Sequence, residues 1–225
     1  MIATFKTSDF VANLKAALLA VQTDEARMHQ CQVRIELAAG VARFVATNGH
    51  WLLVSEAPYL EVVGVDECGK KVLGSSEEAL CIHRADVVAI LKALKSSKKA
   101  ADWDVELDTR GTVSQMGRTA TFAPSRVDFV PYRSFIPAVV VRRDEASMPA
   151  IDPAYLEVVG QAFGILTGGR PCGVRVQPTG GELDPIVVTS TTDNALALVM
   201  PMRTGRPRHV ELLTRFRNAP APRAA

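Results

Sequence analysis

The sequence has few cysteines, few aromatic residues and no long apolar run. Its four cysteines among 225 residues show neither the C-x-x-C spacing of a zinc site nor the pattern of a disulfide framework. We therefore expect reduced, structural thiols. No apolar stretch approaches the roughly 20 residues that cross a bilayer, and the residues after Met1 lack the apolar core of a signal peptide. These absences predict a cytoplasmic protein.

Excess charge is also lacking, since the formal net charge is only +2. The chain therefore has no overall basic coat that would bind nucleic acid by charge alone, and any such contact must come from local clusters. Lysines form one cluster in the middle of the chain, and arginines form another near its end. The members are Lys92, Lys95, Lys98 and Lys99, followed by Arg203, Arg206, Arg208, Arg215, Arg217 and Arg223.

Catalytic signatures are absent as well. The four histidines have no H-x-x-x-H spacing, and the chain has neither a G-x-S-x-G motif nor a glycine-rich phosphate loop. We predict no catalytic residues, no metal site, no cofactor and no enzymatic activity.

The hydrophobic pattern indicates a repeated unit of one strand, one helix and about three strands. In the first copy, Phe10, Leu14 and Ala17 recur at helical spacing after an opening strand, and Ser8 or Asp9 would cap that helix. Val33 then begins a period of two, which predicts an antiparallel meander.

Two further copies follow. The second has an exposed connection at 64–79, a strand at 79–82, a helix at 83–95, and strands at 103–107, 112–116 and 119–123. After a proline-punctuated linker comes the third, with a strand at 139–142, a helix from 152 to about 166, and strands at 173–177, 185–190 and 195–200. Asp152 and Pro153 are suited to cap and start this helix.

Four stretches resemble the bacterial β sliding clamp, in the order and at about the spacing of that family. They are VARFVATNGHWL at 41–52, FVPYRSFIP at 129–137, DPAYL at 152–156 and ALVMPMR at 197–203. The departures are Asn48 where the family has Asp, Trp51 where it has Arg, and a linker proline one place later, at Pro131. They predict a partner pocket that is altered in detail.

The resemblance implies an α+β DNA-clamp fold, built from βαβββ units whose helices line a channel. It covers residues 1–203 and corresponds to the middle domain plus half of the last domain. We expect a complete domain at 1–126, a linker at 127–137, a half domain at 138–203 and a basic tail at 204–225.

By the same resemblance, a hydrophobic pocket would bind short peptides from DNA polymerase, the clamp loader or repair proteins. Its expected residues are Thr47, Gly49, His50, Trp51, Leu52, Pro131, Leu198, Val199, Met200, Pro201, Met202 and Arg203. Double-stranded DNA would be held without sequence preference through phosphate contacts. The candidates are Lys15 from the first helix, and Arg84, Lys92, Lys95, Lys98 and Lys99 from the second.

Clamps of this family close with twelve units, so three units per chain favour a homotetramer over a trimer. Because the number of units per chain is odd, successive chains would alternate in orientation, which gives dihedral symmetry. Two other functions stay open: a monomeric adaptor that keeps the peptide pocket without a ring, and a small DNA-binding regulator that uses the basic tail. In the tail, a helix at 209–217 is either an ordinary terminal helix or a segment that covers the pocket.

Overall fold

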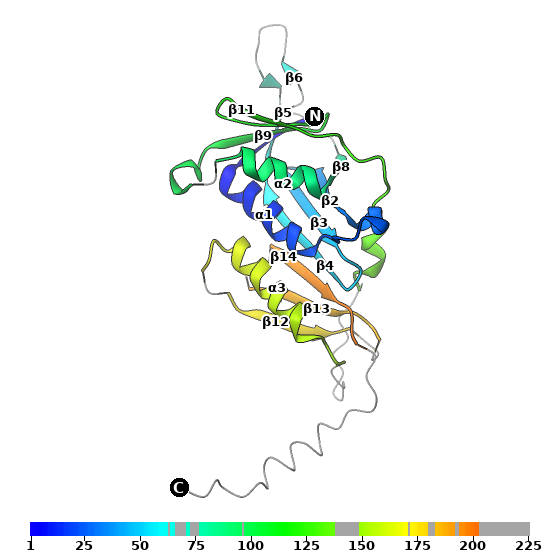
Figure 1. Cartoon of the computed structure of the whole chain (residues 1–225). Coiled ribbons are helices and arrows are strands. Elements are labelled where there is room, and N and C mark those ends of the chain that lie inside the picture. The colour runs from blue at the N-terminus through cyan, green and yellow to red at the C-terminus, as the bar shows by residue number, and fades with distance from the viewer. Residues whose placement is uncertain are drawn as a thin grey trace, which may run out of the picture.

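The structure is a computed structural model of the chain, and it describes residues 1–62, 64–65, 71–72, 77–95, 97–137, 149–170, 172–179, 183–191 and 194–202. Within these ranges the α-helices are α1 (Thr7–Ala20), α2 (Arg84–Ala93) and α3 (Pro153–Leu166) (Figure 1). The 3₁₀ helices are η1 (Glu25–Gln30), η2 (Lys98–Ala100) and η3 (Tyr132–Phe135). The strands are β1 (Ile2–Lys6), β2 (Gln32–Ala38), β3 (Val41–Thr47), β4 (Trp51–Pro58), β5 (Leu60–Val62), β6 (Gly64–Val65), β7 (Lys71–Val72), β8 (Glu78–His83), β9 (Asp104–Asp108), β10 (Thr112–Gln115), β11 (Arg118–Thr121), β12 (Val174–Pro178), β13 (Ile186–Ser190) and β14 (Ala195–Val199).

The first two units exchange their opening strands. β1 of the first unit pairs with β9 of the second, and β8 of the second unit pairs with β2 of the first, both antiparallel. A five-stranded sheet of order β11-β10-β9-β1-β5 results. Because each unit completes the other's sheet, the two units fold as one domain.

The third unit extends the other sheet. β14 pairs antiparallel with β4, which gives the seven-stranded order β12-β13-β14-β4-β3-β2-β8. This pairing joins residues that are more than 130 positions apart in the sequence, since Ala195 lies opposite Ser55. The strand expected at 139–142 lies outside the described residues.

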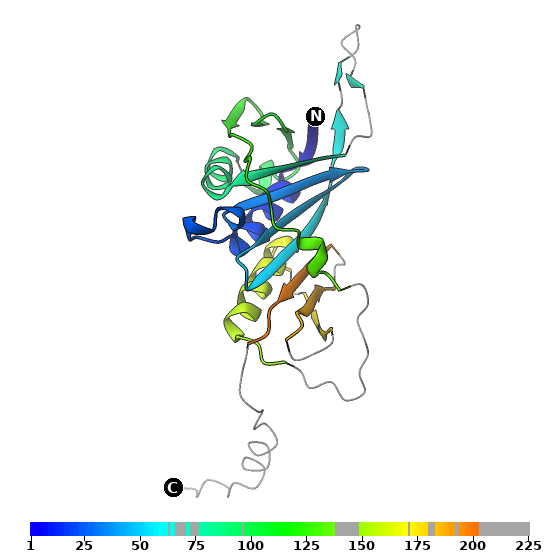
Figure 2. The same ribbon diagram turned by 90° about the vertical axis from the view of Figure 1, so that its right-hand side faces the viewer.

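The helices lie together on one side of the sheets, with α1 between α2 and α3 (Figures 1 and 2). The predicted apolar stripe of α1 faces this interior, and Phe10, Leu14 and Ala17 are completely buried. The rings of Phe10 and Phe44 meet edge to face at 6.0 Å between centroids. The α+β fold with one helical layer is therefore as the sequence predicts. None of the described helices is long and apolar enough to cross a membrane.

The expected side-chain cap of α1 is wrong. The residue before the helix is Lys6, which makes no side-chain capping bond, and Ser8 lies inside the first turn. The amide groups of Thr7 and Ser8 instead donate to the carbonyl oxygens of Trp103 and Ala101, at 2.9 and 3.0 Å. A segment nearly one hundred residues away thus satisfies the free N–H groups of the first turn.

The second helix is shorter than its pattern predicts. It ends at Ala93, because Leu94 adopts an extended backbone (φ −75°, ψ 142°) and its side chain is buried. The amide of Lys95 then donates to the side-chain oxygen of Gln115 at 2.7 Å. Lys95 therefore follows the helix, and Lys98 and Lys99 belong to η2.

Candidate peptide pocket and nucleic-acid interface

A mostly apolar cavity of about 210 Å³ lies on the sheet face opposite the helices, where β4 meets β14. Leu52 and Leu198 lie opposite each other in this pairing, and both point to this face because neighbouring strand residues alternate. The lining residues are Gln30, Thr47, Gly49, Trp51, Leu52, Val130, Phe135, Pro185, Leu198 and Met200.

Six of the twelve predicted pocket residues line this cavity, namely Thr47, Gly49, Trp51, Leu52, Leu198 and Met200. His50, Pro131, Val199, Pro201 and Met202 lie outside its lining, and Arg203 lies outside the described residues. The ring of His50 stacks on Tyr155 of α3 at 5.6 Å, and Val199 is completely buried in the core beneath the helices. Side chains alternate along β14, so Leu198 faces the cavity and Val199 faces the helices.

The turn before β4 is held by its own side chains. The side-chain oxygen of Asn48 accepts hydrogen bonds from the amides of His50 and Trp51, at 3.0 and 3.1 Å. The hydroxyl of Thr47 donates to the carbonyl oxygen of Trp51 at 2.7 Å. Gly49 adopts a φ of +87°, which glycine accommodates without strain. Asn48 supplies the accepting oxygen that an aspartate would supply, so this departure leaves the turn intact.

The linker forms another wall of the cavity, through Val130 and Phe135. We did not predict these two residues, Gln30 or Pro185 as part of the pocket. The linker's resemblance to the clamp motif was a usable signal for Val130 and Phe135. For Gln30 and Pro185 the sequence offered none, because they come from η1 and from the loop before β13.

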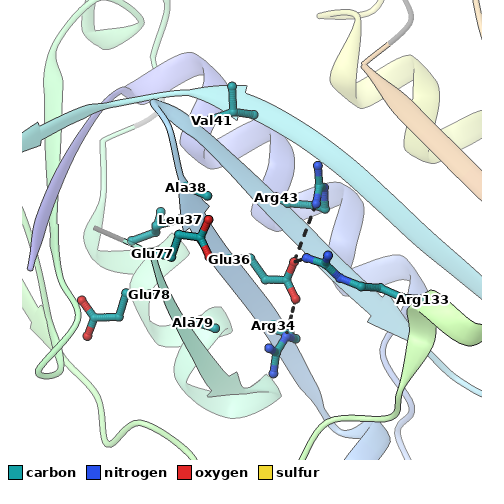
Figure 3. A pocket seen from close by; sticks show the side chains of 10 residues that line it. All are labelled: Arg34, Glu36, Leu37, Ala38, Val41, Arg43, Glu77, Glu78, Ala79 and Arg133. Carbon is teal, nitrogen blue, oxygen red and sulfur yellow. Dashed lines mark hydrogen bonds and ion pairs between the residues drawn. The ribbon is translucent and has the colours of Figure 1, made fainter. Parts of the chain in front are cut away.

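Glu36 of β2 fastens the linker to the sheet. Its carboxylate accepts hydrogen bonds from the hydroxyl of Tyr132 at 2.8 Å and from the guanidinium of Arg133 at 2.6 Å. Arg34 donates to the other carboxylate oxygen at 2.7 Å, and Arg43 lies at 3.8 Å. Figure 3 shows Glu36 between the three arginines.

The pKa of Glu36 reflects these contacts. Burial acts to raise this pKa, but the hydrogen bonds from Arg34, Arg133 and Tyr132 outweigh it and bring the pKa below its ordinary value. The carboxylate is therefore charged at neutral pH and keeps η3 on the outer face of the sheet, across from the helices (Figure 2).

The predicted DNA contacts do not all lie where the sequence placed them. Lys15 is exposed on α1 and Lys92 on α2, while Arg84 is half-buried at the start of α2. Lys95 and Lys99 are exposed but follow the helix, and Lys95 lies over the Trp103 ring at 5.8 Å. The side chain of Lys98 lies outside the described part of the structure. All five described residues belong to the helical layer or to the segment that continues it.

Within the described ranges, no group of three or more His, Cys, Asp or Glu side chains is placed to hold a metal ion. No protein-family model matches the sequence. A search of curated proteins found no match either.

Solved structures do match. The chain is similar to the DNA polymerase sliding clamp from Bacillus subtilis, with a TM-score of 0.66, 14% identity, and coverage of 91% of this chain and 65% of that one. For the DNA polymerase III subunit beta from Pseudomonas aeruginosa, the TM-score is 0.67 at 13% identity, with 91% and 67% of the two chains covered. For the DNA polymerase III beta subunit from Thermotoga maritima, the TM-score is 0.67 at 14% identity, with 91% of this chain and 66% of that one covered.

This chain has the sliding-clamp fold. The expectation drawn from the four motifs is thereby confirmed at the level of the fold. The chain spans about two thirds of the length of the clamp chains that it matches. In this chain, the β4–β14 junction brings the 47–52 turn and the 198–200 strand end to one cavity.

Proposed function

We propose that this chain is the subunit of a DNA sliding clamp, a ring that encloses duplex DNA and tethers other proteins to it without catalysing a reaction. The observation that carries the proposal is the apolar cavity at the β4–β14 junction of a clamp-fold chain. A ring places the helices toward DNA and this cavity on the outside, where partners reach it.

The cavity would bind short peptide segments of a DNA polymerase, a clamp loader or a repair protein. Two of its walls are adaptable, since Phe135 is 50% exposed and Met200 is 41% exposed. Methionine is flexible enough to fit different apolar anchors. Burying one Leu or Phe anchor contributes roughly 1.5–3 kcal/mol, so two anchors contribute roughly 3–6 kcal/mol before the cost of association, and a short peptide should bind weakly and reversibly.

DNA would be contacted through phosphates alone, because a clamp must slide. Exposed lysine side chains on the helical layer are long and flexible, and their contacts with phosphates do not depend on the DNA sequence. We assign this role to Lys15, Lys92, Lys95 and Lys99, with Arg84 and Lys98 as further members of the set.

We propose that the ring is a homotetramer. Three units per chain require four chains to reach twelve, whereas a trimer would leave the ring short unless the tail filled a domain. Among the described residues, the third unit contributes β12, β13 and β14 to its sheet, and no described strand pairs with the outer side of β12. Two chains would combine their third units into one complete domain.

One observation favours a second candidate, the adaptor that binds peptides without a ring. The exposed residues of α3 include Glu157 and no lysine or arginine, so this helix adds no positive charge to a channel. In a tetramer, this helix would lie beside α1 of its own chain, which carries Lys15 but also Asp9. The adaptor instead predicts a monomer that does not hold DNA.

The test is retention on closed circular DNA. Subunits would be diluted until they dissociate, then concentrated with a nicked plasmid, and bound protein would be separated by gel filtration in moderate salt. A ring stays on the circle and leaves once a restriction enzyme linearises it. Equal retention on circular and linear DNA would rule out enclosure.

The basic residues are tested in the same assay. Replacing Lys92, Lys95 and Lys99 by Glu should weaken retention and reduce the slope of log affinity against log salt, because fewer counterions are released. The matched control replaces Lys6, an exposed lysine paired with Asp104 at the start of α1. Tight binding of the wild-type protein to one DNA sequence would instead favour the regulator.

A further inference from the structure

Each of the three units ends in a strand that lies at the outer limit of its own meander. These last strands are β4, β11 and β14. β4 and β14 pair antiparallel with each other over five residues, and α1 and α3 pack together across the same junction. No strand of the described residues pairs with the outer side of β11.

We infer that β11 pairs with β11 of a second copy of this chain, across a two-fold axis. The inference rests on the proposed self-assembly of the chain and names the contact that joins its complete domains. A partner copy's β4 and β14 are already paired with each other. Its β12 is the first strand of a meander, like β2 and β9, and those strands pair with the opening strand of another unit. Among the strands that end a unit, only the partner copy's own β11 lacks a described partner on its outer side.

The hydrogen-bonding pattern of β11 determines the register of this contact. β10 and β11 form a hairpin with a two-residue turn, in which Met116 and Gly117 have φ of 45° and 76°. In such a hairpin, Arg118 and Ala120 direct their backbone groups to β10, since every second pair is hydrogen-bonded. The amide of Phe122 continues this pattern by donating to the carbonyl oxygen of Gly111 at 2.9 Å.

Thr119 and Thr121 therefore direct their amide and carbonyl groups outward. A two-fold axis at Ala120 places Thr119 opposite the partner's Thr121 and satisfies all these groups in two hydrogen-bonded pairs. Ala120 then lies opposite its own copy in a non-hydrogen-bonded pair, where Cα atoms approach to about 4.5 Å.

The surroundings of β11 suit a second copy. α2 packs on β11 and leaves Val88 and Leu91 only half-buried, so α2 would pack on its copy as α1 packs on α3. The side chains of Thr119 and Thr121 are exposed and uncharged, and β-branched residues are favoured in strands. An exposed strand edge of this composition readily pairs with another chain.

The first experiment is cross-linking of Ala120→Cys. A Cα separation of about 4.5 Å lies within the range of a disulfide, so mild oxidation should link most chains into dimers on a non-reducing gel. The control is Met116→Cys, because Met116 is 72% exposed in the turn of the same hairpin. Its two copies would lie roughly 26 Å apart along the paired strands, so it should not form this dimer. Linking of Met116→Cys as strong as that of Ala120→Cys, or no linking at Ala120, overturns the inference.

The second experiment is native mass spectrometry of Thr119→Pro. Proline removes an outward amide while leaving the bonds between β10 and β11 intact, so a tetramer should separate into dimers. Thr119→Val keeps that amide and should stay tetrameric. A tetramer in both variants, together with no link at Ala120, means that other edges form the assembly and only this inference fails. A wild-type dimer that Ala120→Cys links completely means that the edge contact holds and the closed tetramer fails.

Discussion

Glu36 shows how one side chain shapes the pocket without touching a partner. It lies on β2, outside the cavity, yet it binds both Tyr132 and Arg133 of the linker. That linker carries Val130 and Phe135 into the wall of the cavity. At the scale of the residue, the pocket therefore depends on a carboxylate that remains charged.

Glu36→Gln should lower the free energy of unfolding by about 1–2 kcal/mol, because charged hydrogen bonds are lost from a side chain that is 12% exposed. Glu56→Gln is the matched control. Glu56 pairs with Arg43, but both side chains are more than one third exposed, so its loss should cost under about 1 kcal/mol. Urea unfolding at one fixed protein concentration measures both. A cost no greater than that of the control would contradict the anchoring role.

The same residue predicts a pH dependence. The pKa of Glu36 lies below its ordinary value of 4.5 in the folded chain, so its contribution is complete above that pH and is lost as the pH falls through the folded-state pKa. The difference in unfolding free energy between wild type and Glu36→Gln should be constant from neutral pH down to about pH 5 and shrink below it. A difference that grows on acidification would contradict this sign.

The two exposed methionines after β14 differ in their relation to the cavity. Met200 lines it, whereas Met202 does not and donates its amide to the carbonyl oxygen of Ala150 at 2.8 Å. Met200→Ala should weaken binding of a generic clamp-binding peptide about 5- to 30-fold, since truncating a well-packed anchor contact costs roughly 1–2 kcal/mol. Met202→Ala should change it less than two-fold. Fluorescence anisotropy measures both affinities. A larger loss for Met202→Ala than for Met200→Ala would mean that the peptide binds nearer to the tail than the cavity.

At the scale of the element, the helices begin in two different ways. Asp152 caps α3 locally, since its side-chain oxygen accepts from the amide of Ala154 at 2.9 Å and Pro153 starts the helix. α1 has no such cap and relies on carbonyl groups of residues 101 and 103. The start of α3 is therefore determined by its own sequence, whereas the start of α1 depends on hydrogen bonds to a distant loop.

Asp152→Ala should destabilise the chain by about 1 kcal/mol, because a capping oxygen is lost while the helix amides remain. Ser8→Ala should stay within about 0.5 kcal/mol of wild type, since Ser8 is exposed and does not cap α1. The midpoint of urea unfolding reports both changes. An equal loss of stability in Ser8→Ala and Asp152→Ala would indicate that the Ser8 side chain does cap α1.

At the scale of the whole molecule, this chain has the sliding-clamp fold and spans about two thirds of the length of the clamp chains that it matches. The β4–β14 junction keeps the pocket within one chain, while β11 and β12 are edge strands among the described residues. The pocket should therefore exist in every subunit, whatever the assembly, whereas enclosure of DNA requires several subunits.

The tail after Arg203 lies outside the described residues, and Met200, which lines the cavity, comes four positions before the tail in the sequence. Residues 211–216, ELLTRF, resemble the Leu and Phe anchors of clamp-binding peptides. If this segment covers the pocket, a chain that ends at Arg203 should bind the same peptide several-fold more tightly, because more pockets are free. Equal affinity of truncated and full-length protein, both in the assembled state, would reject occlusion.

Local features of the fold were predictable from the sequence because their causes lie within a few residues. The period of Phe10, Leu14 and Ala17 predicts α1, and alternation predicts β2. The Asp152 cap needs only the residues that follow it. Even the clamp fold was predictable, since four short motifs preserve its order along the chain.

Tertiary structure alone decided the contacts between distant segments. The exchange of β1 and β8, the carbonyl groups that start α1 and the hydrogen bonds between Glu36 and the linker each join residues that are from about 40 to just over 100 positions apart. The alternation of side chains along a strand predicts that Leu198 and Val199 face opposite sides of the sheet. Which of the two faces the cavity depends on the packing of α3 and the linker against that sheet. Such contacts depend on the register of whole sheets, and a register is a property of two paired strands that neither strand's sequence contains alone.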